Sequence, residues 1–64
     1  MNPIADLIRD IKIRQAEISQ SLAAGNAATW EAYQRMVGEF LGLQKALDVI
    51  DDFLRNEDEW ASSV

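Results

Sequence analysis

The fold of this chain is decided by residues 30–54, WEAYQRMVGEFLGLQKALDVIDDFL. Large apolar residues recur along this stretch in alternating steps of three and four positions: Tyr33, Met36, Phe40, Leu43, Leu47, Ile50 and Leu54. Such spacing is typical of a helix that packs against another helix. A strand would require alternation at every second residue, which is absent here. We therefore predict one long amphipathic helix over about residues 29–57, followed by an acidic tail over residues 58–64.

The preceding part of the chain predicts a first, shorter helix over about residues 3–24. Asn2 suits the capping position, and Pro3 suits the first helical turn. The polar Gln15 interrupts the apolar face, either as a residue at its edge or as a buried amide that sets the register of helix pairing. The apolar residues of this face are Ile4, Leu7, Ile8, Ile11, Ile18 and Leu22.

A short turn over residues 25–28 separates the two predicted helices. Gly25 suits the left-handed position that ends a helix, and either Thr29 or Asn26 caps the next one. Because so short a connection forces neighbouring helices to run antiparallel, we predict an all-α fold, a coiled-coil-like hairpin forming one domain over residues 1–64. The predicted register places Ile18 opposite Met36, Ile11 opposite Leu43, and Ile4 opposite Ile50.

Length and composition point away from an enzyme. The chain has 64 residues and contains neither cysteine nor histidine. It therefore lacks the thiolate nucleophile, the commonest general base and the commonest transition-metal ligands. The serines and threonine have no evident base, so we predict no catalysis and no cofactor. Small domains without disulfides or metals often depend on oligomerisation or on a partner.

The charge pattern also restricts the partners. Eleven acidic and six basic residues give a net charge of −5, which disfavours nucleic acid and anionic lipid. Two helical pairs, Asp10–Arg14 and Glu31–Arg35, are expected to neutralise part of the charge. We expect no signal peptide and no membrane span. A solvated face, rather than a metal site, is predicted for the acidic residues Asp48, Asp51, Asp52, Glu57, Asp58 and Glu59, since they lack the glycine-centred spacing of a calcium loop.

The second predicted helix carries another line of residues on roughly the opposite side from its apolar seam. Its members are Gly38, Gly42, Ala46, Val49, Phe53 and Trp60. One interpretation is a chance scatter of exposed apolar residues, which is common on protein surfaces. The other is a second interface, favoured by the size of Phe53 and Trp60. We predict that this line contacts a partner.

Within residues 30–54, the pattern Trp30-Glu31-x-Tyr33-Gln34-Arg35-Met36-Val37-Gly38-Glu39, then Gly42-Leu43, Ala46-Leu47 and Ile50-Asp51-Asp52-x-Leu54, resembles small helical proteins of tailed bacteriophages. Those proteins are encoded among the head and DNA-packaging genes. The resemblance covers about half the chain and implies a virion or capsid-assembly component whose partners include a portal or capsid subunit. It implies no catalytic residue.

These observations predict a non-enzymatic interaction protein that acts through apolar helix faces, in the virion or the host cytoplasm. It would bind itself, a capsid subunit or a portal subunit. One alternative is a small acidic regulator that blocks a basic surface of a partner. Another is an RNA-binding helical bundle, although the chain lacks a basic stripe.

Overall fold

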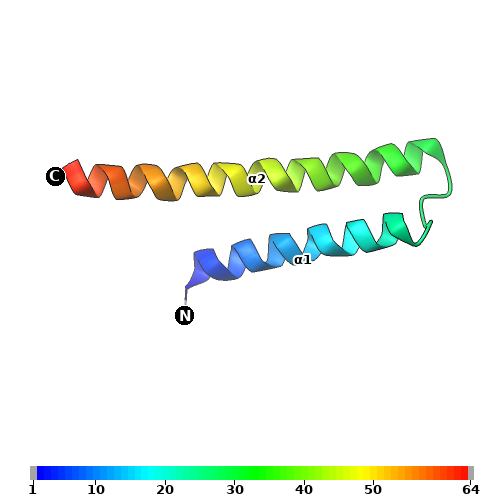
Figure 1. Cartoon of the computed structure of the whole chain (residues 1–64), viewed down its shortest axis with the longest axis horizontal. Coiled ribbons are helices and arrows are strands. Elements are labelled where there is room, and N and C mark those ends of the chain that lie inside the picture. Colours follow the sequence, from blue (N-terminus) through cyan, green and yellow to red (C-terminus); the bar gives the residue numbers. More distant parts are fainter. Residues whose placement is uncertain (1, 64) are drawn as a thin grey trace.

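The computed structural model describes the backbone of residues 2–63 and the side chains of residues 2–56. Within these residues the chain forms two helices, α1 (Pro3–Ala23) and α2 (Trp30–Ser63). They lie side by side and antiparallel, joined by one turn, as Figure 1 shows. The predicted all-α hairpin is therefore confirmed.

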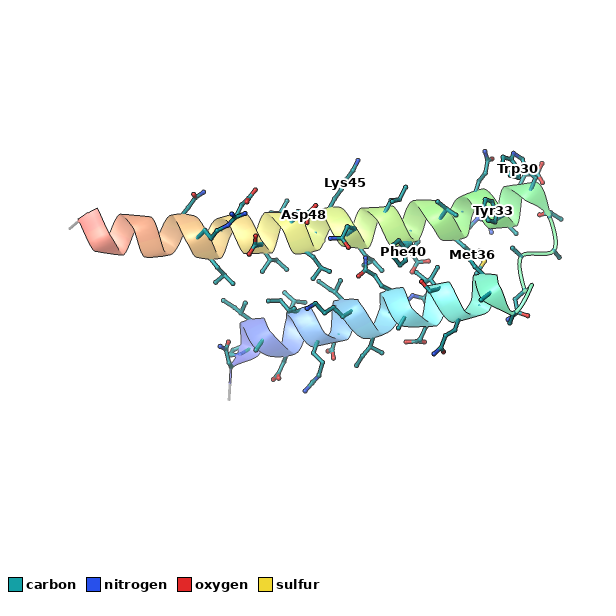
Figure 2. All side chains as sticks on the ribbon, in the orientation of Figure 1. Trp30, Tyr33, Met36, Phe40, Lys45 and Asp48 are labelled. Atoms are coloured by element: carbon teal, nitrogen blue, oxygen red, sulfur yellow. The ribbon has the colours of Figure 1, made fainter. Side chains whose placement is uncertain are left out.

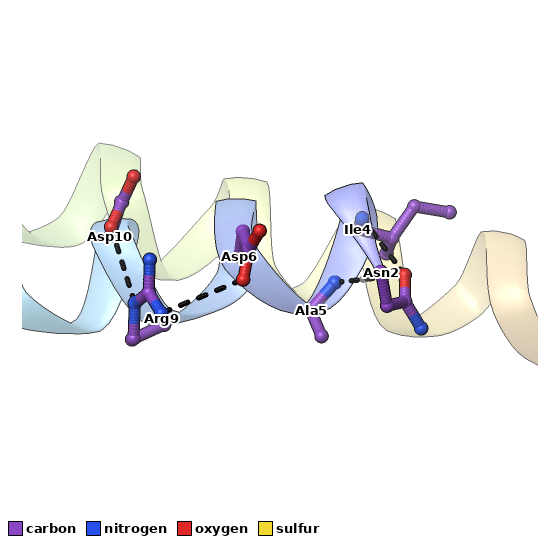
Figure 3. A network of polar contacts seen from close by, with 6 residues as sticks. All are labelled: Asn2, Ile4, Ala5, Asp6, Arg9 and Asp10. Atoms are coloured by element: carbon purple, nitrogen blue, oxygen red, sulfur yellow. Dashed lines mark hydrogen bonds and ion pairs between the residues drawn. The ribbon is translucent and has the colours of Figure 1, made fainter.

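The start of α1 follows the capping chemistry of its first residues. The Asn2 side-chain oxygen accepts hydrogen bonds from the backbone N–H groups of Ile4 (3.0 Å) and Ala5 (3.2 Å). One turn later, Arg9 lies 3.5 Å from both Asp6 and Asp10 (Figure 3). Because free N–H groups are satisfied and an acidic residue lies in the first turn, the helix can begin at Pro3.

The turn is built as its sequence predicts. Gly25 has a φ of 78°, in the left-handed region that favours glycine. The N–H groups of Gly25 and Asn26 donate to the carbonyl oxygens of Leu22 and Ser21, and so close the end of α1 in a Schellman arrangement. Thr29 then caps α2, because its hydroxyl accepts from the N–H of Ala32 at 3.0 Å.

The second helix continues beyond its predicted end. We predicted that this helix ends near residue 57, whereas in the structure it ends at Ser63. No glycine or proline interrupts residues 54–63, so nothing in the sequence stops the helix there. At 34 residues against 21, α2 extends well past the first turn of α1, as Figure 1 shows.

The hairpin is elongated rather than globular. It measures 53 × 23 × 13 Å, with a radius of gyration of 15.6 Å. A compact domain of this length would have a radius of gyration of about 11 Å. Two helices in one layer leave both flanks of their contact open to solvent, and this shape limits how much side-chain surface can be buried.

The enclosed core is correspondingly small and lies in the half of the hairpin nearer the turn. Ile18 is the one hydrophobic residue classed as buried among the described side chains, with 3% of its surface exposed. From the facing helix, Met36 and Phe40 point toward α1, whereas Lys45 points away (Figure 2). Most of the predicted seam is half-buried: Ile8, Ile11, Leu22, Met36, Phe40, Leu43, Leu47, Ile50 and Leu54.

Three residues predicted for the hairpin core are instead exposed. These are Leu7 (50%), Tyr33 (43%) and Ile4 (37%). The register itself is as predicted at two places, because Ile18 lies with Met36 beside one hollow and Ile4 with Ile50 beside another. The exposure arises because each helix has one neighbour, and residues at the ends and edges of a two-helix contact are covered on one side only.

Candidate protein-interaction surface

The largest purely apolar feature lies at the open end of the hairpin, away from the turn. Side chains from the first two turns of α1 and from the middle of α2 surround a shallow hollow of about 290 Å³. We call its lining the open-end patch, which consists of Ile4, Leu7, Val49, Ile50 and Phe53. Val49 is 66% exposed and Phe53 58% exposed, so the apolar side chains of this patch face solvent.

The predicted partner line of α2 contributes part of this patch. Val49 and Phe53 lie beside the first turns of α1 rather than on the side of α2 directly opposite it, because they share a hollow with Ile4 and Leu7. The line therefore borders the helix contact instead of facing away from it. Ile4 and Leu7 were assigned to the core by their spacing, and sequence reasoning missed them as surface residues.

The remaining members of that line differ in character. Ala46 is half-buried. Gly38 and Gly42 are exposed, and a Cβ atom built on either would meet no other atom within 4 Å. The space above these two glycines is open. The side chain of Trp60 lies outside the described residues.

A second exposed apolar cluster lies near the turn. The rings of Trp30 and Tyr33 stack with their centroids 5.4 Å apart and an angle of 19° between their planes. Trp30 is 65% exposed. Helical spacing places Leu41 on the same side of α2, and Leu41 is 53% exposed. We call Trp30, Tyr33, Val37 and Leu41 the turn-end patch. Sequence reasoning missed Leu41, although its spacing of four from Val37 marks it.

These two patches lie on opposite flanks of the hairpin. At about 100° per residue, Val37 and Leu41 project to one side of the α2 seam, whereas Val49 and Phe53 project to the other. The positions of two hollows support this assignment. Val37 and Phe40 border one hollow together with Leu22, and Ile50 and Phe53 border another hollow together with Leu7. The hairpin therefore offers two separate apolar surfaces.

A polar chain of side chains crosses the middle of the hairpin. Gln15 is buried, with 8% of its surface exposed, and its amide donates to the Phe40 carbonyl at 3.3 Å and to Gln44 Oε1 at 3.2 Å. Gln44 in turn donates to Asp48 Oδ1 at 3.2 Å. Of the two interpretations left open for Gln15, burial and these partners favour the register-setting amide.

An ion pair joins the helices on the opposite flank from this chain. Arg14 Nε lies 2.7 Å from Glu39 Oε2, and Arg14 Nη2 lies 3.2 Å from Oε1. The hydrogen bond from Arg14 lowers the pKa of the Glu39 carboxyl and raises the pKa of the guanidinium. The expected Asp10–Arg14 pair is not formed, since Asp10 pairs with Arg9.

A larger hollow of about 500 Å³ lies over the Gln15 chain and contains both charges and apolar groups. Its lining consists of Ile8, Lys12, Gln15, Gln44, Leu47, Asp48, Asp51 and Leu54.

Among the described residues, no group of three or more potential ligands lies close enough together to hold a metal ion. Nor does either helix, over the same part of the chain, contain a stretch long and apolar enough to cross a bilayer.

The hairpin accordingly has two exposed apolar patches and, in its middle, the register-setting polar side chains around Gln15. Comparison with known proteins gives no family model, curated protein or solved structure that matches this chain.

Proposed function

We propose that this chain is an interaction protein whose open-end patch binds another protein. The observation that carries the proposal is the exposure of Val49 (66%), Phe53 (58%) and Leu7 (50%) around one hollow that has no charged or polar lining residue. Contiguous exposed apolar surface costs free energy in water, about 25 cal/mol for each Å². Binding a protein there would remove that cost.

The small core supports the same proposal. Ile18 is the single hydrophobic side chain classed as buried among the described residues, and Gln15 occupies the adjacent central position. Domains of this size are marginally stable even when compact. A partner that covered the open-end patch would supply burial that the hairpin does not provide itself.

The setting we propose is the head or DNA-packaging apparatus of a tailed bacteriophage, in the virion or the infected cell. This part rests on the resemblance of residues 30–54 and on the suitability of an elongated helical hairpin for decorating a larger assembly. The partner would then be a capsid subunit, a portal subunit or another copy of the chain.

The test compares two substitutions that add the same charge at equally exposed apolar positions. Phe53→Asp changes the open-end patch, and Leu41→Asp changes the turn-end patch, with exposures of 58% and 53% in the unchanged chain. Both variants are first checked for helix content by circular dichroism. The wild-type chain and each variant are then immobilised separately, and the retention of soluble wild-type chain and of the proteins encoded beside its gene is measured on each.

We expect Phe53→Asp to lower retention by about 100-fold or more, because a buried unpaired carboxylate costs several kcal/mol, and Leu41→Asp to leave it nearly unchanged. Equal retention of both variants would contradict the proposal. Salt separates the alternatives: an acidic mimic of net charge −5 that blocks a basic surface would lose binding as ionic strength rises, whereas apolar docking would not. Retention of structured RNA would instead indicate the RNA-binding bundle.

A further inference from the structure

The isolated hairpin exposes more surface than a folded chain of its mass should. Its accessible area is 5108 Å² for 7.2 kDa. Compact monomers of that mass expose about 4,100 Å². The excess of about 1,000 Å² is close to the area of about 800 Å² that each partner buries in a stable protein–protein interface. An interface of standard size with one partner would therefore cover an area comparable to this excess.

The sequence of α2 makes a second copy of this chain a suitable partner. Its exposed line has large residues toward the open end, Val49 and Phe53, and small ones toward the turn, Gly42 and Gly38. Both pairs are four residues apart, and Ala46 lies between them. The large side chains project into solvent, and the space over the glycines is open.

We infer that the exposed line of α2, from Gly38 to Phe53, binds the same line of a second copy, with the two α2 helices antiparallel about a two-fold axis between Lys45 and Ala46. In that register Val49 of each copy lies over Gly42 of the other, and Phe53 lies over Gly38. A two-fold interface requires such reciprocal pairing, in which residue i contacts j and residue j contacts i. The inference rests on the proposed function and names its partner.

The proposed face is not covered by the first helix of the same chain. Lys45, next to the axis, points away from α1 in Figure 2, so the face between Gly42 and Val49 is not covered by the chain's own first helix. Ile4, Leu7 and Ile50 border the same patch and would flank the helix pair. The product is a four-helix assembly, in which each hairpin contributes two helices and the usual antiparallel packing applies.

Disulfide formation tests both the partner and the register, because the chain contains no cysteine of its own. A disulfide requires Cα atoms about 4.4–6.8 Å apart. Ala46→Cys should therefore link to itself across the two-fold axis. Neither Gly42→Cys nor Val49→Cys alone should link, since the two copies of each position lie about 10 Å apart along the helix. A mixture of Gly42→Cys and Val49→Cys should give the mixed dimer.

Leu41→Cys is the control on the other flank, where the side chain is 53% exposed, and Gly42→Cys is the control on the same line. We expect Ala46→Cys to oxidise to dimer about tenfold faster than Leu41→Cys or Gly42→Cys at equal concentration. Light scattering of the unmodified chain should give the mass of a dimer. The association should tighten as salt is added, because two chains of net charge −5 repel each other at low ionic strength.

A monomer by light scattering, or equally fast cross-linking at Leu41→Cys and Ala46→Cys, would overturn the inference. Two results separate it from the proposed function. A monomeric chain that binds a protein encoded beside its gene, and loses that protein on Phe53→Asp, overturns the second copy as partner and leaves the interaction surface standing. A chain that binds neither overturns both.

Discussion

The middle of the hairpin and its open end are built on opposite principles. Between the middle and the turn, Ile18 is enclosed, and the polar groups beside it are paired across the helices by Gln15–Gln44 and Arg14–Glu39. At the open end, apolar side chains lie exposed around a hollow without polar lining. Paired polar groups define one register, whereas apolar contact is tolerant of register. The middle therefore specifies how the helices align, and the open end supplies the surface that remains for a partner.

The largest expected effect comes from removing the centre of the core. Ile18→Ala should destabilise the hairpin by about 3 kcal/mol, because a buried side chain is truncated and its neighbours cannot fill the space. Val49→Ala, at a position 66% exposed, is the matched control and should change the stability of the isolated hairpin by less than about 0.5 kcal/mol. Urea unfolding followed by circular dichroism measures both. Equal losses would contradict the assignment of Ile18 as the core.

The second effect concerns register rather than burial. Gln15→Leu should raise stability by about 1–2 kcal/mol, since an apolar side chain replaces a buried amide. It should also allow neighbouring registers, because the cross-helix hydrogen bonds to Phe40 and Gln44 are lost. Amide nuclear magnetic resonance spectra should show broadened or multiple peaks for the variant. A single sharp set of peaks would show that Gln15 does not set the register.

A third substitution weakens the open end without touching its apolar residues. Asn2→Ala removes the side-chain acceptor for the N–H groups of Ile4 and Ala5 and should cost about 1 kcal/mol. Hydrogen exchange should speed up in the first turn of α1 and stay unchanged around Ile18. Asn2→Asp retains the acceptor and should restore protection. Uniformly faster exchange would mean that the two regions unfold together.

The smallest effect is a dependence of stability on pH. Because the hydrogen bond from Arg14 lowers the pKa of Glu39 in the folded chain, its stabilisation is complete above the ordinary glutamate pKa of about 4.3. It is lost as the pH falls through the lowered value. Arg14, whose pKa is raised, stays protonated throughout. The melting-temperature difference between wild type and Glu39→Gln should therefore be small at neutral pH and disappear under acid. A difference that grows under acid would contradict this sign.

The helices and the turn were predictable because their determinants are local. Asn2, Gly25 and Thr29 each act on the backbone within a few residues, and the structure places all three in their expected roles. The spacing of apolar residues likewise identified the faces that meet. Spacing reports which side of a helix is apolar, and it does not report how many neighbours cover that side. For this reason Ile4 and Leu7 were assigned to the core although they are exposed.

Pairings across the two helices were harder to predict. Arg14 had a suitable acidic residue four positions earlier, yet it pairs with Glu39, 25 residues away. Long flexible side chains choose among several neighbours once the register is fixed, and each such surface pair contributes little free energy. The open-end patch was similarly hidden, because it combines residues from two helices more than 40 positions apart.

The unequal lengths of the two helices have a practical consequence for anyone who handles this protein. Both described ends of the chain, Asn2 and Ser63, lie at the same end of the hairpin in Figure 1, and the turn lies at the other. A purification tag or fused reporter before Asn2 therefore emerges next to Ile4 and can mask it, whereas one after Ser63 emerges ten residues, about 15 Å, beyond Phe53. An insertion at Asn26 places the added group at the far end, out of reach of that surface.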